Sequence, residues 1–111
     1  MPERVTHNKL VRDKIPEIIK QDGSTPHTRI ITDQNELLAV ADQKIDEELA
    51  ELRADPSLSE YADVQEALRK RAELDGHTME EIEAERVKKV AERGGFEQNI
   101  YLEYVDIPGE E

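Results

Sequence analysis

Four acidic residues form two matching pairs near the middle of the chain, spaced as Glu48-x-x-Glu51 and Glu60-x-x-Asp63. Residues three apart lie on the same face of an α-helix, so each pair can present two carboxylates side by side. Pro56 stands between the pairs and would interrupt a helix at that point. The spacing therefore predicts two helices joined by a tight turn, with four carboxylates converging.

The phase of these acids relative to the apolar residues predicts that they point inward. On a wheel of about 100° per residue, Glu48 and Glu60 fall within the apolar stripes of their helices, and the other two acids fall at the edges. A solvated acidic face would lie opposite the apolar stripe instead. The stripes consist of Leu38, Ala41, Ile45, Leu49 and Leu52 in the first helix and Tyr61, Val64, Ala67 and Leu68 in the second.

Inward-facing carboxylates need cations, because burying an unpaired charge is very costly. Oxygen ligands with no Cys or His nearby suit Mg²⁺, or Mn²⁺ in its place, and Mg²⁺ is often shared with substrate phosphates. The metal ligands predicted in this way are Glu48, Glu51, Glu60 and Asp63. The alternative is purely structural, since such acid pairs are common in an acidic chain and Ser57-x-x-Glu60 also matches a capping box.

Composition limits the classes of function. A chain of 111 residues corresponds to one small domain. Only 36% of the residues are hydrophobic, and a thin monomer core favours a homodimer or homotetramer. The net charge of −12 argues against a nucleic-acid partner. The chain has no Cys for disulfides or zinc thiolates, and no signal peptide or membrane span is recognised, so we expect a cytoplasmic protein without a membrane partner.

Helix caps, glycine stops and periodicity predict the elements in chain order. They are a short helix over 15–23, a strand over 28–31, helices over 34–54, 58–75 and 79–93, and a strand over 100–105. We expect a mainly α fold, in which a four-helix antiparallel bundle carries a short accessory two-stranded β element. It forms a single domain over residues 7–105 between flexible ends at 1–6 and 106–111. An isolated pair of strands is weak, so it must pack on the helices or cross to another subunit. The sequence leaves open whether the strands pair within or between subunits.

Basic residues occur at three places that could contact phosphates. Three lie within six residues near the N-terminus, one lies on the acidic face of the third helix, and three lie on or beside the apolar side of the last helix. The alternative is that these residues form ion pairs with surplus carboxylates. Those of the last helix could instead interact favourably with the dipole at its C-terminus. The substrate-contact candidates are Lys9, Arg12, Lys14, Arg71, Arg86, Lys89 and Arg93.

Three blocks of sequence resemble a known family. EExxE at Glu47–Glu51, followed by ExxD at Glu60–Asp63, resembles the all-α nucleoside triphosphate pyrophosphohydrolases of the MazG-like superfamily. NKLVRDKIPEII at residues 8–19 and ERGGFEQNIYL at residues 92–102 are similar to its small phosphoribosyl-ATP pyrophosphohydrolase-like branch. Together the blocks cover about residues 7–105, and the resemblance implies a MazG-like helical bundle.

The resemblance also implies a reaction, in which a nucleoside triphosphate and water give the monophosphate and diphosphate with the help of Mg²⁺. One or more metal ions held by the four acids would bridge phosphate oxygens and lower the pKa of the attacking water. Glu48 or Glu51 would orient that water, whereas Glu47 matches the motif but falls on the wrong side of the wheel. The implied role is house-cleaning of non-standard nucleotides.

Two alternatives remain open at this stage. The first is a phosphoribosyl-ATP pyrophosphohydrolase of histidine biosynthesis, which uses the same chemistry on another substrate. The second is a non-catalytic helical protein whose acids bind a structural cation or a partner. The preferred base is also open, although three Tyr and one Phe are available to stack on it or to form the core.

Overall fold

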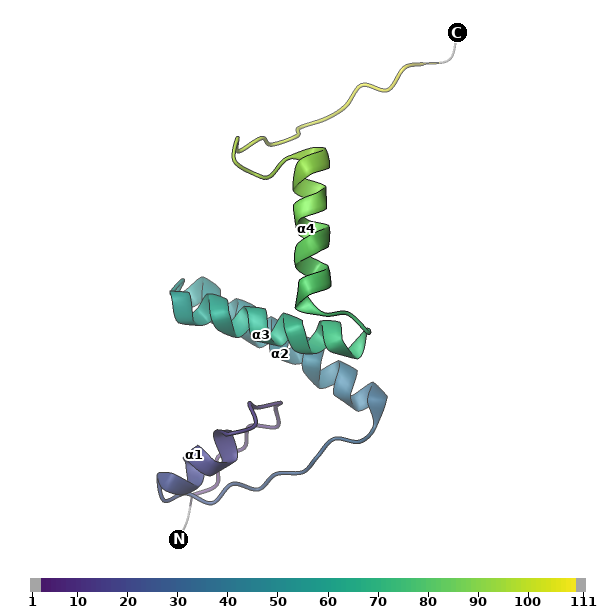
Figure 1. The fold of residues 1–111 in the computed structure, drawn as a ribbon. Helices are drawn as coiled ribbons and strands as arrows, with labels where there is room; N and C mark the ends of the chain where they lie inside the picture. Colours follow the sequence, from purple (N-terminus) through teal and green to yellow (C-terminus); the bar gives the residue numbers. More distant parts are fainter. Residues whose placement is uncertain (1–2, 110–111) are drawn as a thin grey trace. The chain divides into compact units, whose positions relative to one another are not determined.

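The computed structural model describes residues 3–109 and is mainly α, as predicted (Figure 1). The helices in this range are α1 (Ile15–Gln21), α2 (Gln34–Ala54), α3 (Leu58–Leu74) and α4 (Met79–Arg93). The chain divides into two compact units, the first ending at Thr78 and the second beginning at Met79. The acidic pairs belong to the first unit.

The ends of α2 and the start of α3 follow local signals in the sequence. The Asp33 side chain accepts a hydrogen bond from the Glu36 backbone N–H at 2.9 Å, which caps α2. Asp55 and Pro56 separate the two helices, because proline cannot continue the hydrogen-bond pattern of a helix. The Ser57 hydroxyl then accepts a hydrogen bond from the Glu60 N–H at 3.3 Å and caps α3. These predicted boundaries are confirmed.

Removal of the α2 cap gives a testable stability change. The Asp33→Ala variant is expected to lose about 1 kcal/mol, because the Glu36 N–H loses its acceptor at the helix start. Urea unfolding should show a lower midpoint with an unchanged slope. The matched control is Asn35→Ala in the same turn, and equal losses in the two variants would contradict the capping role.

The C-terminal end of α3 depends on glycine. Gly76 has a φ of +85°, which side chains with a Cβ rarely adopt. This turn lets the His77 backbone N–H donate to the Ala72 carbonyl at 2.9 Å, which satisfies the last turn of the helix. The predicted stop at Gly76 is therefore confirmed.

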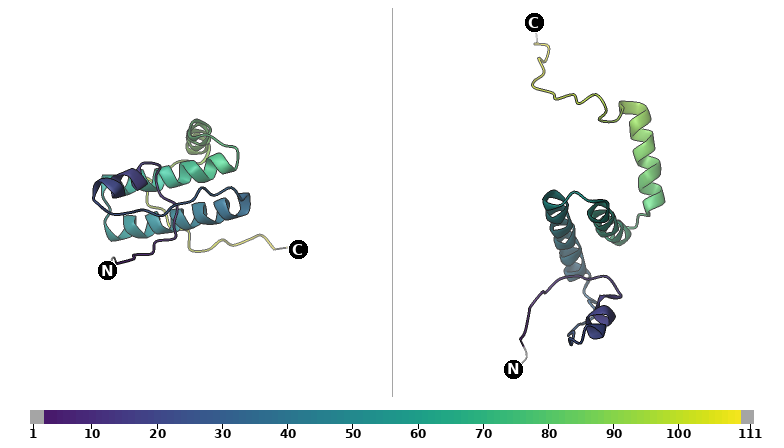
Figure 2. Two further views of the ribbon diagram at one scale, coloured as in Figure 1. Left: turned by 90° about the horizontal axis from the view of Figure 1, so that it is seen from below. Right: turned by 90° about the vertical axis from the view of Figure 1, so that its left-hand side faces the viewer.

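Helices α2 and α3 form an antiparallel hairpin, and they lie side by side in the views of Figures 1 and 2. The buried residues in the described range are Ala41 and Glu48 of α2 and Ala67 of α3. The two alanines let the helices approach closely, and no larger hydrophobic side chain in this range is buried. The core is thin and contains a carboxylate.

The apolar stripe predicted for α3 is partly wrong. Tyr61 is 59% exposed and Leu68 is 46% exposed, although both were expected to face α2. Tyr61 and Ala67 lie about 120° apart on a wheel of about 100° per residue, so they cannot both pack on one neighbouring helix. The structure turns the side that carries Ala67 toward α2.

The predicted β element is absent from the described residues, because neither 28–31 nor 100–105 forms a strand. The two segments belong to different units, and a strand without a paired neighbour is not stable. The first unit contains α1, α2 and α3 and the second contains α4, so the four-helix antiparallel bundle stays a prediction.

The predicted domain over 7–105 spans both units. Residues 1–2 and 110–111 of the predicted flexible ends lie outside the described residues, and 3–6 and 106–109 have no regular secondary structure. No helix within the described range is long and apolar enough to cross a membrane.

Candidate metal centre

Three of the four predicted acids come together between α2 and α3. Glu48 of α2 and Glu60 and Asp63 of α3 each offer a carboxylate oxygen, and these oxygens lie within 4.8 Å of one another. We call these three residues the acidic cluster. Glu51, the fourth predicted ligand, is exposed and lies outside it. The cluster forms because Pro56 breaks the helix and α3 returns along α2.

Two oxygens of the acidic cluster are buried without a partner. Glu48 is only 6% exposed, and its Oε2 makes no hydrogen bond. Glu60 Oε2 is also buried and makes none. Buried polar atoms are almost always hydrogen-bonded, since the unpaired state is costly. The orphaned oxygens therefore fit the ligand set of a hard cation.

Negative charge accumulates at this end of the hairpin. Burial raises the pKa of Glu60 above its usual value, and the charges of Asp63 and Glu48 raise it further. The charge of Glu48 is the main cause of the raised pKa of Glu51, aided by a side-chain contact with Glu48. A bound divalent cation would reverse these effects by favouring the ionised carboxylates.

Lys44 is a member of this site that the sequence reasoning missed. Its Nζ lies 3.1 Å from Glu48 Oε1 and 3.5 Å from Glu47 Oε1. Burial acts to lower the pKa of Lys44, but its contacts with the two glutamates outweigh burial and raise it. The i,i+4 spacing of Lys44 and Glu48 on one helix was the available signal. Because Lys44 contacts Oε1 of Glu48, the buried Oε2 of the same carboxylate still has no partner.

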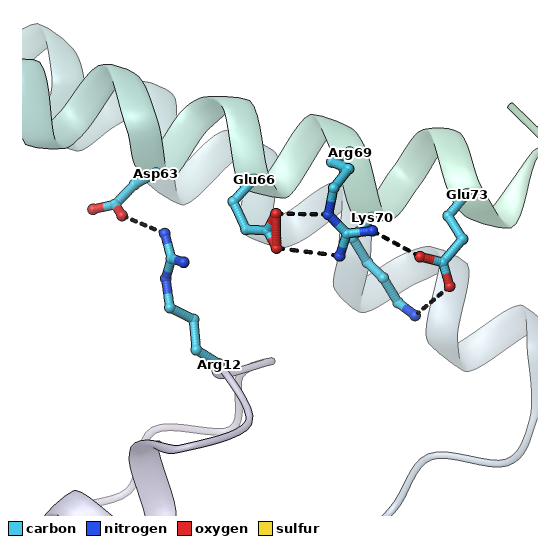
Figure 3. Close-up of polar contacts among 6 residues, drawn as sticks. All are labelled: Arg12, Asp63, Glu66, Arg69, Lys70 and Glu73. Carbon is cyan, nitrogen blue, oxygen red and sulfur yellow. Dashed lines mark hydrogen bonds and ion pairs between the residues drawn. The ribbon is translucent and has the colours of Figure 1, made fainter. Parts of the chain in front are cut away.

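The segment before α1 contacts the hairpin through two cations. Arg12 Nη2 lies 2.7 Å from Asp63 Oδ1 (Figure 3). Lys9 Nζ lies 3.1 Å from Glu47 Oε1, an acid placed outside the metal shell by its wheel position. Burial would raise the pKa of Glu47, but Lys9 and Lys44 outweigh it and lower that pKa. Lys14 is the exposed N-cap residue of α1.

Arg71 pairs with acids other than those of the cluster. Its guanidinium bridges Asp42 Oδ1 of α2 at 2.7 Å and Asp75 Oδ1 at 2.6 Å. In this arrangement Arg71 is a counter-ion that ties the end of α3 to α2. Arg69 forms similar surface pairs with Glu66 and Glu73 along α3 (Figure 3).

The remaining candidate cations lie in the second unit. Arg86 makes two hydrogen bonds to the Glu83 carboxylate, at 2.6 and 2.9 Å. The bonds and charge of that carboxylate raise the pKa of Arg86. Lys89 and Arg93 are exposed on α4. A role for these three residues in substrate binding stays a prediction.

Comparison with known proteins gives one relative and no family. No protein-family model and no solved structure matches the chain. A protein of Mycolicibacterium smegmatis (strain ATCC 700084 / mc(2)155), described as uncharacterized, is 54% identical over 46 residues. The match covers 41% of this chain and 46% of the relative, so the chain spans about half the length of the relative.

Proposed function

We propose that the acidic cluster binds Mg²⁺, with Mn²⁺ as a substitute, and that the chain is a nucleoside triphosphate pyrophosphohydrolase. One observation carries the proposal: Glu48 Oε2 and Glu60 Oε2 are buried without partners beside a third carboxylate. Hard cations with all-oxygen ligand sets are the chemistry that such atoms favour. The exposed carboxylate of Glu51 is available to a metal ion that also contacts substrate.

Charge balance near the cluster supports a divalent ion. Glu48 and Asp63 each have one contacting cation, Lys44 and Arg12 respectively. Glu51 and Glu60 have no ion pair with any residue in the range 3–109, and both have raised pKa values. The local excess of negative charge is therefore suited to one Mg²⁺ rather than to a further lysine or arginine.

The assignment of a reaction rests on the sequence blocks. The order of the three blocks resembles the MazG-like pyrophosphohydrolases, and the cluster includes acids from both halves of the EExxE and ExxD motif. In this proposal the metal supplies electrostatic stabilisation of the phosphates and activation of water. Glu48 or Glu51 would orient that water by accepting a hydrogen bond from it. Arg12 contacts Asp63 at the edge of the cluster, where its guanidinium could bind a phosphate oxygen.

The experiment is product analysis with a panel of substrates. The purified chain is incubated with Mg²⁺ and standard nucleotides, non-standard nucleotides or phosphoribosyl-ATP, and the products are separated by chromatography. Monophosphate and diphosphate are expected, with no orthophosphate. Preference for phosphoribosyl-ATP would favour the histidine-pathway alternative, and preference for non-standard nucleotides would favour a house-cleaning role in the cytoplasm.

The non-catalytic alternative makes a different prediction. Arg12 and Lys44 already pair with two of the cluster acids, which is the arrangement expected of a purely structural ion network. In that case Mg²⁺ would stabilise the fold, but no substrate in the panel would be turned over. The absence of turnover together with metal-dependent stabilisation would establish the alternative.

A further inference from the structure

The second unit leaves many apolar side chains uncovered. No side chain described in residues 79–109 is buried, and Ile82, Val87 and Val90 of α4 are exposed. A fifteen-residue helix is marginal in water without tertiary packing. The segment that follows α4 exposes Phe96, Ile100, Tyr101, Leu102, Tyr104, Val105 and Ile107. So many large apolar side chains exposed in one stretch of chain favour an interaction site.

The exposed area is large enough for a stable interface. Phe96, Tyr101 and Tyr104 are between 77% and 97% exposed. Aromatic side chains bury about 150–250 Å² each, so these three alone offer roughly 450–750 Å². A standard protein interface buries about 800 Å² on each partner. The four aliphatic residues of the segment supply the remaining area.

The segment and the helix before it carry opposite charge. Between Phe96 and Ile107 there are three carboxylates and no cation. Residues 86–93 of α4 contain four cations and one carboxylate. Lys89 and Arg93 make no ion pair with any residue that the structure describes. The two surfaces therefore carry opposite charge, and both expose apolar side chains that could pack together.

We propose that these surfaces meet in a homodimer, where residues 96–107 of one copy pack along residues 86–93 of α4 in a second copy. Within the second unit the segment leaves the end of α4 without folding back along it (Figure 1). Two-fold symmetry forms each contact twice, and this doubles the buried area. This surface belongs to the second unit, whereas the acidic cluster belongs to the first.

Sedimentation equilibrium of the full chain is the first test. A particle of twice the 12.7 kDa chain mass is expected. The double variant Tyr101→Asp/Leu102→Asp is expected to dimerise at least about 100-fold more weakly, because two apolar anchors are lost. Leu58→Asp, at an exposed position of α3, is the matched control and should remain dimeric. A monomeric unaltered chain, or equal dimerisation of the double variant, would overturn the proposal.

Cross-linking tests the same contact without disrupting the packing. The chain contains no Cys, so single-cysteine variants report one position each. Isotope-labelled Val90→Cys is mixed with unlabelled Leu102→Cys and treated with a short bismaleimide. Cross-linked peptides that join a labelled and an unlabelled chain are expected. When unlabelled Ser59→Cys replaces Leu102→Cys as the control, few such peptides should form. In the Val90→Cys/Leu102→Cys chain, links confined to single chains would show a monomeric fold-back and contradict the dimer.

Discussion

Glu48→Gln is expected to reduce Mg²⁺-dependent release of diphosphate at least about 100-fold. The substitution preserves side-chain volume but replaces a charged oxygen of the acidic cluster with an amide. Even changes to residues that only support metal ligands typically cost about 10–100-fold in metal affinity or activity, so the loss of a ligand should exceed that range. Initial rates at saturating Mg²⁺ measure the effect, with circular dichroism to show that the helices persist.

Glu47→Gln is the matched control for this variant. Glu47 and Glu48 are adjacent on α2, and both pair with Lys44. Glu47 lies outside the acidic cluster and carries no orphaned buried oxygen. Its substitution therefore removes the same charge and the same type of ion pair, but not a proposed ligand. Similar activity losses in the two variants would contradict the assignment of Glu48 as a ligand.

Glu60→Gln is expected to have opposite effects on stability with and without metal. Without metal the variant should be more stable than the unaltered chain at pH 7, because it removes a carboxylate whose charge is disfavoured by burial and by repulsion from Asp63 and Glu48. With Mg²⁺ the order should reverse. A ligand at 100 times its dissociation constant stabilises a protein by about 2.7 kcal/mol, and the variant should lose that gain. Thermal unfolding in EDTA and in excess Mg²⁺ measures both effects.

The pH dependence of this effect follows from the raised pKa of Glu60. The folded chain holds this proton more tightly than the unfolded chain, whose Glu pKa is near 4.5. The stability of the metal-free protein therefore falls as pH rises from 4.5 through the raised pKa. The gain from Glu60→Gln should be greatest at neutral pH and should disappear toward pH 4.5.

Glu66→Gln on the same helix is the control, and it is expected to change stability at pH 7 in the opposite direction. The hydrogen bond and charge of Arg69 lower the pKa of Glu66, so ionised Glu66 stabilises the fold above its ordinary pKa. This contribution is lost as pH falls, and Glu66→Gln should lower stability slightly at pH 7. Identical changes in the stability of the two variants would show a general effect of removing negative charge and would contradict local repulsion within the cluster.

Local signals in the sequence were sufficient to predict the hairpin. Asp33 and Ser57 are side-chain caps, Pro56 excludes a continuous helix, and Gly76 permits a left-handed turn at the end of α3. Each of these signals acts within about one helical turn. For this reason the bounds of α2 and α3 could be predicted without knowledge of the tertiary structure.

The contacts of the candidate site could be predicted only in part. They depend on how α3 packs on α2 and on residues that lie far apart in the sequence. The wheel placed Glu51 and Asp63 equally at stripe edges, but only Asp63 joins the cluster. The angle at which α3 rests on α2 makes this difference, and a wheel for a single helix contains no such angle. The pair between Arg12 and Asp63 joins residues 51 positions apart, so no local pattern could predict it.

The strand prediction failed for a related reason. The residues of IYLEYV favour β-structure, but a strand is stable only when another strand pairs with it or when it packs on a surface. Nothing within residues 3–109 pairs with this segment as a strand. The β-propensity is a property of the segment alone, whereas a stable strand needs a neighbouring strand or a surface to pack on.

A crystal structure of the chain grown with Mn²⁺ would test the central claim most directly. We expect an anomalous-scattering peak between α2 and α3, from an ion coordinated by carboxylate oxygens of Glu48, Glu60 and Asp63. The orphaned oxygens Glu48 Oε2 and Glu60 Oε2 should be among the ligands or bonded to metal-bound water. A map without a peak at this position, or with the three side chains turned apart into solvent, would contradict the metal centre and the proposed reaction with it.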